Sequence, residues 1–388
     1  MSNPSRRFRP SISLAATLAI VSGFAAGCVS SSDHTTRTPW GVIDSDTGPL
    51  AASVYTLRND NGLVAKFTDF GATLIEFNAP DRNGDLADIT LGFDDAALYM
   101  TDSPYFGTVA GRSANRIERG QFTLDGETYQ LATNNGANHL HGGDRGFDKH
   151  MWEGQSVDDS RGQAIRFTRT SPEGEENYPG TLDASVTYVL TDDNEFITEF
   201  SATTDAPTLC NLAQHAYWNL GGHDSGSIRD HQLTIFSDEY TPVDAGLIPT
   251  GELVAVAGTP FDFRAEKPIG QDLESVGDDP KGYDHNFVIR GTANVLRPVL
   301  RAYDPASGRI MELRADKPGL QFYSGNFLDG SITGKDGVAY EQYAGFCAES
   351  QHFPNAINEP AWASPILRPG ETYSHTMVTR FTTDVEEN

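Results

Sequence analysis

Short segments in which apolar and polar residues alternate recur from about residue 52 onward, and this pattern limits the possible fold most. Alternation with a period of two turns one side of a segment to the core and the other to solvent, as in a β-strand. Turn residues separate the segments. Asp125-Gly126, for example, joins residues 121–124 to residues 127–131 in the manner of a hairpin. The sequence therefore predicts an all-β fold, a large antiparallel β-sandwich.

The predicted strands are short and evenly spaced. They cover residues 54–57, 63–67, 72–77, 88–91, 121–124, 127–131, 164–168, 182–190, 195–200, 232–236, 286–289, 296–303, 310–313, 320–323 and 372–381. One short helix is expected within residues 93–99, and no segment keeps a helical period of 3.6 residues over a dozen positions. Because no linker, charge block or internal repeat interrupts residues 40–381, we expect one large β domain.

The charge of the chain argues against one class of partner. The 388 residues carry a formal net charge of −26 at pH 7. A protein that binds nucleic acid needs a basic surface to neutralise phosphates. Nucleic acid is therefore not an expected partner, whereas a small neutral or cationic ligand is compatible with this charge.

The first residues have the composition of an export signal. Three arginines within residues 6–9 precede an apolar run, residues 12–26, which is too short to span a bilayer comfortably. The run ends in Ala25-Ala26-Gly27-Cys28, which resembles the cleavage site of a bacterial lipoprotein, where the cysteine becomes the lipidated first residue. Ordinary signal-peptide cleavage nearby is the alternative.

Cleavage before Cys28 would divide the chain into three parts. Residues 1–27 would be the signal peptide, residues 28–48 a polar tether rich in serine and threonine, and residues 49–388 the folded domain. The expected location is then the periplasm of a Gram-negative bacterium, at the outer membrane. In that case the chain contacts the membrane only through its lipid anchor.

Two further cysteines, Cys210 and Cys347, lie in segments that look like strands. They could pair in an oxidising compartment, or they could remain two buried thiols. The sequence leaves both possibilities open.

A histidine surrounded by aromatic and amide side chains is the most prominent polar feature. His215 lies in residues 211–222, which end in a Gly-Gly turn. A histidine can act as a general acid near neutral pH. Aromatic rings can cover the apolar face of a sugar while amides bond its hydroxyls. The alternative is a structural histidine within an aromatic core.

A second histidine motif contains His139 and His141. In a strand, this spacing would place both rings on one face, so metal binding must be considered, and the motif resembles part of a cupin metal site. The acidic ligand that would complete such a site is lacking, since Asp144 and Asp148 are at unsuitable positions. We therefore expect no metal.

Donors for hydroxyl groups cluster in residues 111–116. Arg112, Asn115 and Arg116 follow an apolar pair and could together donate several hydrogen bonds to a sugar. The alternative is that the arginines pair with carboxylates on the surface of this acidic protein.

Two carboxylates complete the candidate site. Asp284 lies between Tyr283 and a histidine and is suited to bind a pair of sugar hydroxyls. Glu349 follows apolar residues, and a partly desolvated carboxylate is a better base than a solvated one. The alternatives for Glu349 are an exposed strand residue or, together with His352, a metal ligand.

Taken together and in this order, the motifs resemble the aldose 1-epimerase (mutarotase) family, from about Gly62 to the C-terminus. The likeness is carried by residues 111–117, 139–143, 146–149, 211–222, 242–244, 248–251, 283–287, 321–330 and 345–355. The resemblance implies a galactose mutarotase-like supersandwich with a cleft that binds sugar hydroxyls and needs no cofactor.

The resemblance also implies roles for single residues. His215 matches the general acid and Glu349 the general base. The sugar-binding positions are matched by Asn115, Arg116, His141, Tyr217, Asp284 and Gln321. The implied activity is the interconversion of α and β anomers of free aldohexoses such as galactose and glucose, by a monomer or a homodimer.

The chemistry of this reaction suits the residues on its own terms. A base must remove the proton of the C1 hydroxyl while an acid protonates the ring oxygen, and closure of the ring reverses both transfers. Three alternatives remain open at this stage. They are a carbohydrate-binding lipoprotein without activity, a metal-dependent cupin-like enzyme, and a related epimerase that acts on another sugar or a sugar phosphate.

Overall fold

The computed structural model describes residues 35–45, 48–277 and 280–385. Cys28 and the predicted signal peptide lie outside these residues. The predicted tether, residues 28–48, is too long, because residues 36–43 form a strand that pairs within a sheet. Among the described helices, none has the length and apolar character needed to cross a bilayer.

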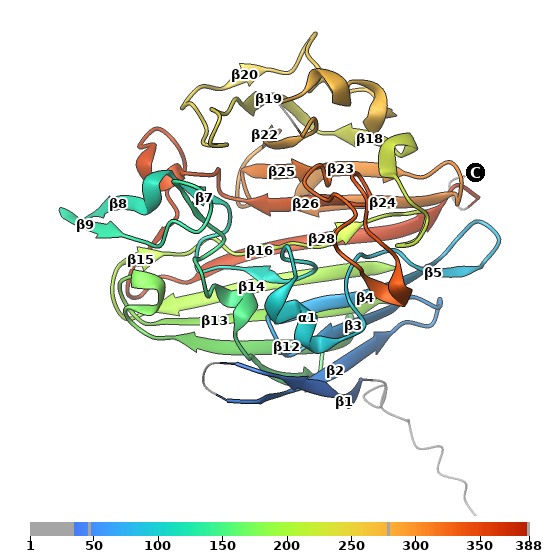
Figure 1. Cartoon of the computed structure of the whole chain (residues 1–388), viewed down its shortest axis with the longest axis horizontal. Helices are drawn as coiled ribbons and strands as arrows, with labels where there is room; N and C mark the ends of the chain where they lie inside the picture. Colours follow the sequence, from blue (N-terminus) through green and yellow to red (C-terminus); the bar gives the residue numbers. More distant parts are fainter. Residues whose placement is uncertain (1–34, 46–47, 278–279, 386–388) are drawn as a thin grey trace, which may run out of the picture. The chain divides into compact units, whose positions relative to one another are not determined.

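Three large antiparallel sheets contain most of the strand residues (Figure 1). The first contains β1 (Thr36–Ile43), β2 (Leu50–Arg58), β3 (Val64–Thr68), β4 (Thr73–Pro80) and β5 (Leu86–Asp88), in this spatial order. The second contains β11 (Glu153–Val157), β12 (Gly162–Ser171), β13 (Leu182–Thr191), β14 (Glu195–Thr204), β28 (Tyr373–Thr383), β24 (Arg309–Ala315), β23 (Arg297–Tyr303), β18 (Gln232–Ile235) and β21 (Lys267–Pro268). The third contains β17 (Tyr217–Trp218), β26 (Phe346–Gln351), β25 (Gly319–Tyr323), β22 (Asp284–Ile289), β19 (Ser237–Thr241) and β20 (Val254–Ala255).

Short strand pairs and helical turns connect the large sheets. The pairs are β6 (Val109–Ala110) with β16 (Ala213–Gln214), β7 (Arg116–Ile117) with β10 (His139–Leu140), β8 (Gln121–Leu124) with β9 (Glu127–Gln130), and β15 (Thr208–Leu209) with β27 (Ile366–Leu367). The helices are α1 (Ala96–Thr101) and the 3₁₀ turns η1 (Glu118–Gly120), η2 (Phe147–Lys149), η3 (Glu175–Asn177), η4 (Ile228–Asp230), η5 (Ile269–Gln271), η6 (Leu273–Ser275), η7 (Lys335–Gly337) and η8 (Ala356–Asn358).

The main hydrophobic core contains side chains from all three large sheets. Phe67 of the first sheet stacks on Tyr188 of the second, with ring centroids 4.4 Å apart. Phe77 of the first sheet contacts both Phe381 of the second, at 4.5 Å, and Trp218 of the third, at 5.7 Å. Face-to-face packing of sheets through their apolar sides defines a β-sandwich. The predicted all-β, antiparallel sandwich is therefore confirmed.

Strand β26 turns its two faces to different surroundings. Phe346 and Ala348 belong to the main core, whereas Cys347 belongs to a second cluster on the opposite face. Because side chains alternate along a strand, Glu349 shares the face of Cys347. Cys347 is buried and unpaired, as is Cys210, so the free-thiol alternative holds in this structure.

Candidate active site

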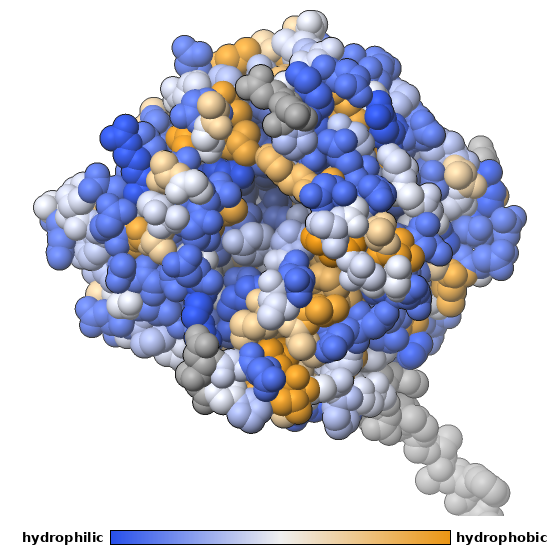
Figure 2. All heavy atoms as spheres, viewed as in Figure 1, coloured by the Kyte–Doolittle hydropathy of each residue, from blue (hydrophilic) through white to orange (hydrophobic). Residues whose placement is uncertain are grey.

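A hollow opens in the face of the molecule shown in Figure 2, bordered by both hydrophilic and apolar residues. The same view in Figure 1 places β7, β16, β25 and β26 around it. Three of these strands carry the predicted site residues Arg116, Gln321 and Glu349, and His215 directly follows the fourth, β16, so these residues meet at one place.

His215 lies between two short strands that pair with different partners. β16 before it pairs with β6, and β17 after it pairs with β26. The backbone N–H of His215 donates to the carbonyl of Thr108 at 2.9 Å, and its own carbonyl accepts from the N–H of Gly107 at 3.0 Å. Because both the N–H and the carbonyl of His215 are hydrogen-bonded, the backbone fixes the direction in which the imidazole points.

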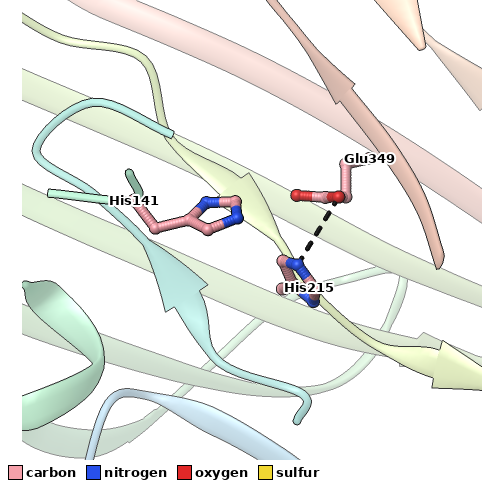
Figure 3. Close-up of side chains that lie close together, drawn as sticks. All are labelled: His141, His215 and Glu349. Carbon is pink, nitrogen blue, oxygen red and sulfur yellow. Dashed lines mark ion pairs between the residues drawn. The ribbon is translucent and has the colours of Figure 1, made fainter. Parts of the chain in front are cut away.

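The imidazole of His215 faces the carboxylate of Glu349 on β26 (Figure 3). Nε2 of the histidine and Oε1 of the glutamate are 3.6 Å apart, and both side chains are buried. The ring of His141 lies edge-on to that of His215, with centroids 4.9 Å apart. The three groups predicted from separate motifs thus form one cluster.

The two histidines of the His-x-His motif have separate environments. β10 ends at Leu140, and His141 adopts a left-handed conformation with φ of 49°. The expected alternation of a strand therefore fails, and the prediction that both rings share one face is wrong. His139 instead bonds the carbonyl of Ala132 at 2.8 Å and the hydroxyl of Tyr178 at 2.6 Å, which is a structural role.

The cluster could in principle hold a metal, because the ligand atoms of His141, His215 and Glu349 lie within 4.8 Å of one another. His352 is not part of this group. Nδ1 of His141 accepts a hydrogen bond from the backbone N–H of Asn115 at 3.2 Å, so the proton of the neutral ring is on Nε2. A ligating histidine normally donates from its second nitrogen rather than accepting there. His141 is therefore arranged as a hydrogen-bond donor to a ligand and is a poor fit for a metal.

A second group of polar residues borders the cluster. Nη1 of Arg116 lies 3.3 Å from Oδ2 of Asp284, and Nε2 of Gln321 donates to Oδ1 of Asp284 at 2.6 Å. Gln321 is also the cross-strand partner of Glu349. Asn115 precedes Arg116 and accepts its backbone N–H at 2.8 Å. The predicted sugar-binding residues are thus linked to one another and to the acid–base pair.

The polar groups of Tyr217 and Arg112 bond to other parts of the protein. The hydroxyl of Tyr217 donates to the carbonyl of Pro104 at 3.0 Å, and its ring lies 5.2 Å from that of His215, so it supports the imidazole. Arg112 is fully buried and donates to the carbonyls of Gly180 and Ser171 at 2.8 and 3.1 Å. The expectation that both arginines donate to a sugar is therefore wrong for Arg112.

Burial opposes a charge on either member of the pair. It raises the pKa of Glu349 well above the usual range, an effect that Asp284 increases and Arg116 decreases. Burial lowers the pKa of His215 to about 4, against smaller opposing effects of its own carbonyl and of Asp284. A neutral acid with a neutral imidazole contains the same number of protons as a carboxylate with an imidazolium. One proton moving between the two groups therefore interconverts these forms without a change in net charge.

Two residues of the site were not predicted. Tyr105, with φ of 69°, places its ring 4.6 Å from that of His141 and 5.7 Å from that of His215. Nothing in its local sequence pointed to this contact. Cys347 Sγ lies 3.6 Å from Nδ1 of His215. Its position two residues before Glu349 was the available signal, because residues i and i+2 of a strand share a face.

The part of the chain that matches known proteins contains all of these motifs. The family model described as Aldose 1-epimerase matches residues 53–380. The galactose mutarotase of Sus scrofa is 42% identical over 341 residues, which are 88% of this chain and 96% of that protein. The aldose 1-epimerase of Escherichia coli (strain K12) is 38% identical over 323 residues, which are 82% of this chain and 92% of that protein.

Solved structures share the fold. The crystal structure of an aldose epimerase homologue from C. elegans superposes with a TM-score of 0.78 at 32% identity. The match covers 89% of this chain and 99% of that one.

Proposed function

Because the chain belongs to the aldose 1-epimerase family, we propose that Glu349 and His215 are the base and the acid of its reaction. The chain is an aldose 1-epimerase and interconverts the α and β anomers of aldoses. The observation that carries the assignment of residues is the buried pair itself, with Nε2 and Oε1 3.6 Å apart and with Gln321 as the cross-strand partner of Glu349.

The proposed mechanism needs only two proton transfers and one rotation. The carboxylate of Glu349 removes the proton of the C1 hydroxyl while Nε2 of His215 protonates the ring oxygen, and the bond between C1 and the ring oxygen breaks. The aldehyde rotates about the C1–C2 bond, and the ring closes on the other face as both transfers reverse. A positioned proton-transfer group contributes roughly 10²–10⁴-fold in rate.

The surrounding polar groups suit a sugar that carries several hydroxyls. Among the described residues, Oε1 of Gln321 and Oε2 of Glu349 are buried acceptors without a hydrogen-bond partner. Both lie on neighbouring strands in direct register. Sugar hydroxyls would satisfy these acceptors, while Arg116, Asn115 and His141 supply donors.

We propose free aldohexoses, galactose and glucose among them, as substrates, and no cofactor. The name of the Sus scrofa relative, galactose mutarotase, supports galactose. Polarimetry gives the rate at which the protein anomerises fresh α-galactose, α-glucose and a sugar phosphate. These rates rank the candidate substrates. Faster turnover of the phosphate than of either free hexose would contradict this proposal. Light scattering of the purified protein distinguishes the proposed monomer from the proposed homodimer.

Two substitutions test the acid–base pair. Glu349→Gln keeps the shape of the side chain but cannot accept the proton, and His215→Asn cannot supply one near neutral pH. Each should lower kcat by about two to four orders of magnitude. His231→Asn is the matched control, because His231 is equally buried but bonds the N–H of Leu220 instead. Turnover by folded Glu349→Gln near the wild-type rate would remove Glu349 from its role.

We also propose that the chain is exported, cleaved before Cys28 and anchored by lipid at the outer membrane of a Gram-negative bacterium. The basic leader, the short apolar run and the Ala-Ala-Gly-Cys ending support this proposal. Cys28→Ser should move the protein from the membrane fraction to the soluble fraction, since the acyl chains supply the membrane affinity. A mature N-terminus that begins at another residue would contradict it.

A further inference from the structure

Buried polar atoms that lack a hydrogen-bond partner extend beyond Glu349 on the third sheet. Among the described residues, Oδ1 of Asn286 and both Oε1 and Nε2 of Gln351 are such atoms. The two side chains are as inaccessible as the proposed base, since Asn286, Gln351 and Glu349 are 1%, 0% and 2% exposed. Folded proteins leave few buried polar groups unpaired, so these three atoms indicate a bound ligand.

The register of three strands places these side chains next to the proposed base. Asn286 on β22, Gln321 on β25 and Glu349 on β26 form one cross-strand row. In the next row on the same face, Gly319 on β25 pairs with Gln351 on β26. Side chains directly opposite each other on antiparallel strands share a face, as do residues i and i+2 of one strand. The four polar side chains therefore lie on one face of the sheet around Gly319.

Gly319 is the member of this group without a side chain. A Cβ at Gly319 would lie 2.2 Å from Oδ1 of Asn286 and 2.9 Å from Cδ1 of Phe353. Asn286 thus leans over the backbone of Gly319, and its amide nitrogen donates to Oγ1 of Thr241 at 3.5 Å, so its oxygen is turned to the glycine. Gln351 is the cross-strand partner of the same glycine. We refer to the surroundings of Gly319, formed by Asn286 and Gln351, as the Gly319 compartment.

The chemistry of the Gly319 compartment suits a neutral hydroxyl. Oδ1 of Asn286 can only accept a hydrogen bond, and Nε2 of Gln351 can only donate one. A hydroxyl does both, because it has one O–H donor and two acceptor lone pairs. A carboxylate could not donate to Asn286, and an ammonium could not accept from Nε2 of Gln351. The ligand oxygen is therefore that of a sugar hydroxyl or of water.

The position of His215 indicates which sugar hydroxyl reaches the compartment. Nδ1 of His215 lies 3.6 Å from Sγ of Cys347, and Nε2 lies 3.6 Å from Oε1 of Glu349. The imidazole is therefore on the Cys347 side of Glu349, whereas Gln351 is on the other side along β26. With the ring oxygen of the aldose at His215 and the C1 hydroxyl at Glu349, carbon 2 continues from C1 away from the ring oxygen. Its hydroxyl is the one directed towards Gln351.

On the basis of the acid–base roles proposed above, we propose that Asn286 and Gln351 bind the C2 hydroxyl of the aldose beside Gly319. A site built to bond a hydroxyl discriminates against the analogue that lacks it, because its own buried polar groups are then left unpaired. The contact narrows the substrate class to aldoses with a hydroxyl at C2, and it disfavours 2-deoxy sugars.

The test compares galactose with 2-deoxygalactose. For each sugar, kcat/KM from polarimetry is divided by the spontaneous rate of mutarotation, because the two sugars differ in intrinsic reactivity. The wild type should favour galactose about 10- to 100-fold, the typical effect of leaving buried polar groups unpaired. Equal normalised values for the two sugars in the wild type would overturn the proposal without any variant.

Two variants should remove this preference. Gln351→Leu deletes the donor, and Gly319→Ala displaces Asn286, because the new Cβ would lie 2.2 Å from its Oδ1. In each folded variant the normalised kcat/KM for galactose should fall about tenfold or more, while that for 2-deoxygalactose stays within about twofold of the wild-type value. Equal losses for the two sugars would overturn the proposal in favour of an ordered water or a structural role. No loss for either sugar would overturn it as well.

A second sugar and a second glutamine serve as controls. D-fucose, which is 6-deoxygalactose, retains the C2 hydroxyl and should lose as much as galactose in Gln351→Leu. A clearly smaller loss for D-fucose would assign the compartment to the C6 hydroxyl and overturn the proposal. Gln214→Leu replaces a glutamine that is similarly buried but donates to the carbonyl of Gly107 at 3.4 Å, so the preference for galactose should remain. Thermal melts show whether each variant is folded.

This test and that of the acid–base pair fail independently. Near-normal rates of Glu349→Gln and His215→Asn would refute the acid–base assignment whatever the preference between the two sugars. An unchanged preference in Gln351→Leu and Gly319→Ala, with Glu349→Gln inactive on both sugars, would refute the contact with the C2 hydroxyl alone.

Discussion

Asp284→Asn should move the whole pH profile of the epimerase to lower pH. The rate should fall at low pH where the pair gains a proton and at high pH where it loses one, which gives a bell with two limbs. Asp284 raises the pKa of Glu349 and also that of His215. Removal of this negative charge makes protons leave both groups more easily, so both limbs should move in the same direction.

The size of the movement follows from the register of the third sheet. Asp284 on β22 pairs with Tyr323 on β25, which pairs with Cys347 on β26. Two strand spacings are roughly 9–10 Å. Glu349 lies two residues further along β26 than Cys347, which makes its separation from Asp284 about 12 Å. At that distance and an effective dielectric constant of about 20, a unit charge contributes about 1.4 kcal/mol, which corresponds to a movement of about one pH unit. The amide still accepts the bond from Gln321, so the fold should remain intact.

The assay is the initial rate of optical rotation above the spontaneous rate, as kcat/KM from pH 4 to pH 10. Arg116→Met should move both limbs to higher pH, because Arg116 lowers the pKa of Glu349 and of His215. Asp238→Asn is the control for net charge, since its exposed side chain pairs with Arg290. Limbs that move in opposite directions in Asp284→Asn, or that stay fixed, would refute the electrostatic reasoning.

Three further predictions concern stability and the walls of the site. The urea midpoint should decrease as the pH is lowered from 6.5 to 4, because the unfolded chain binds more protons than the folded chain in this range. Each buried histidine should lower the free energy of unfolding by about 1.4 kcal/mol per pH unit. Equal midpoints at pH 7 and pH 5 would contradict this. The histidines whose pKa burial lowers to about 4 are His139, His215, His231, His285 and His352. Arg112→Met should cost about 3–5 kcal/mol in urea unfolding, since it leaves buried acceptors without their donor; a loss below 1 kcal/mol would argue against this role. Tyr105→Ala should raise KM about tenfold by removing an aromatic wall, whereas Tyr105→Phe should stay near the wild type; equal KM values for both would remove that ring from the sugar site.

Local patterns were sufficient for much of the fold. The hairpin around Asp125-Gly126 forms as predicted, because its turn and its alternating residues act over a few positions. The segment around Cys347 looked like a strand, but the bounds of β26 were not predicted, because all six of its residues are buried and no polar face marks the alternation. Strand β1 was read as tether for a related reason, since most of its residues are exposed and its pairing with β2 is a tertiary contact.

The candidate site was predictable in its residue types but not in its directions. Arg112 and Arg116 have the same chemistry in one motif, yet a packed turn sends Arg112 into the core and leaves Arg116 beside Asp284. Single-sequence patterns contain no information on such turns. The same limit applies to His139 and His141, because the left-handed conformation of His141 is not visible in the spacing.

The alternation along β26 has a consequence for engineering. Glu349 and Cys347 contact His215 on one face of the strand, while Phe346 and Ala348 pack into the main core on the other. Libraries that randomise alternate positions of β22, β25 and β26 would therefore vary the sugar-facing surface and leave the structural side of the same strands unchanged. Positions shifted by one residue would instead randomise the main core and yield mostly inactive, destabilised clones.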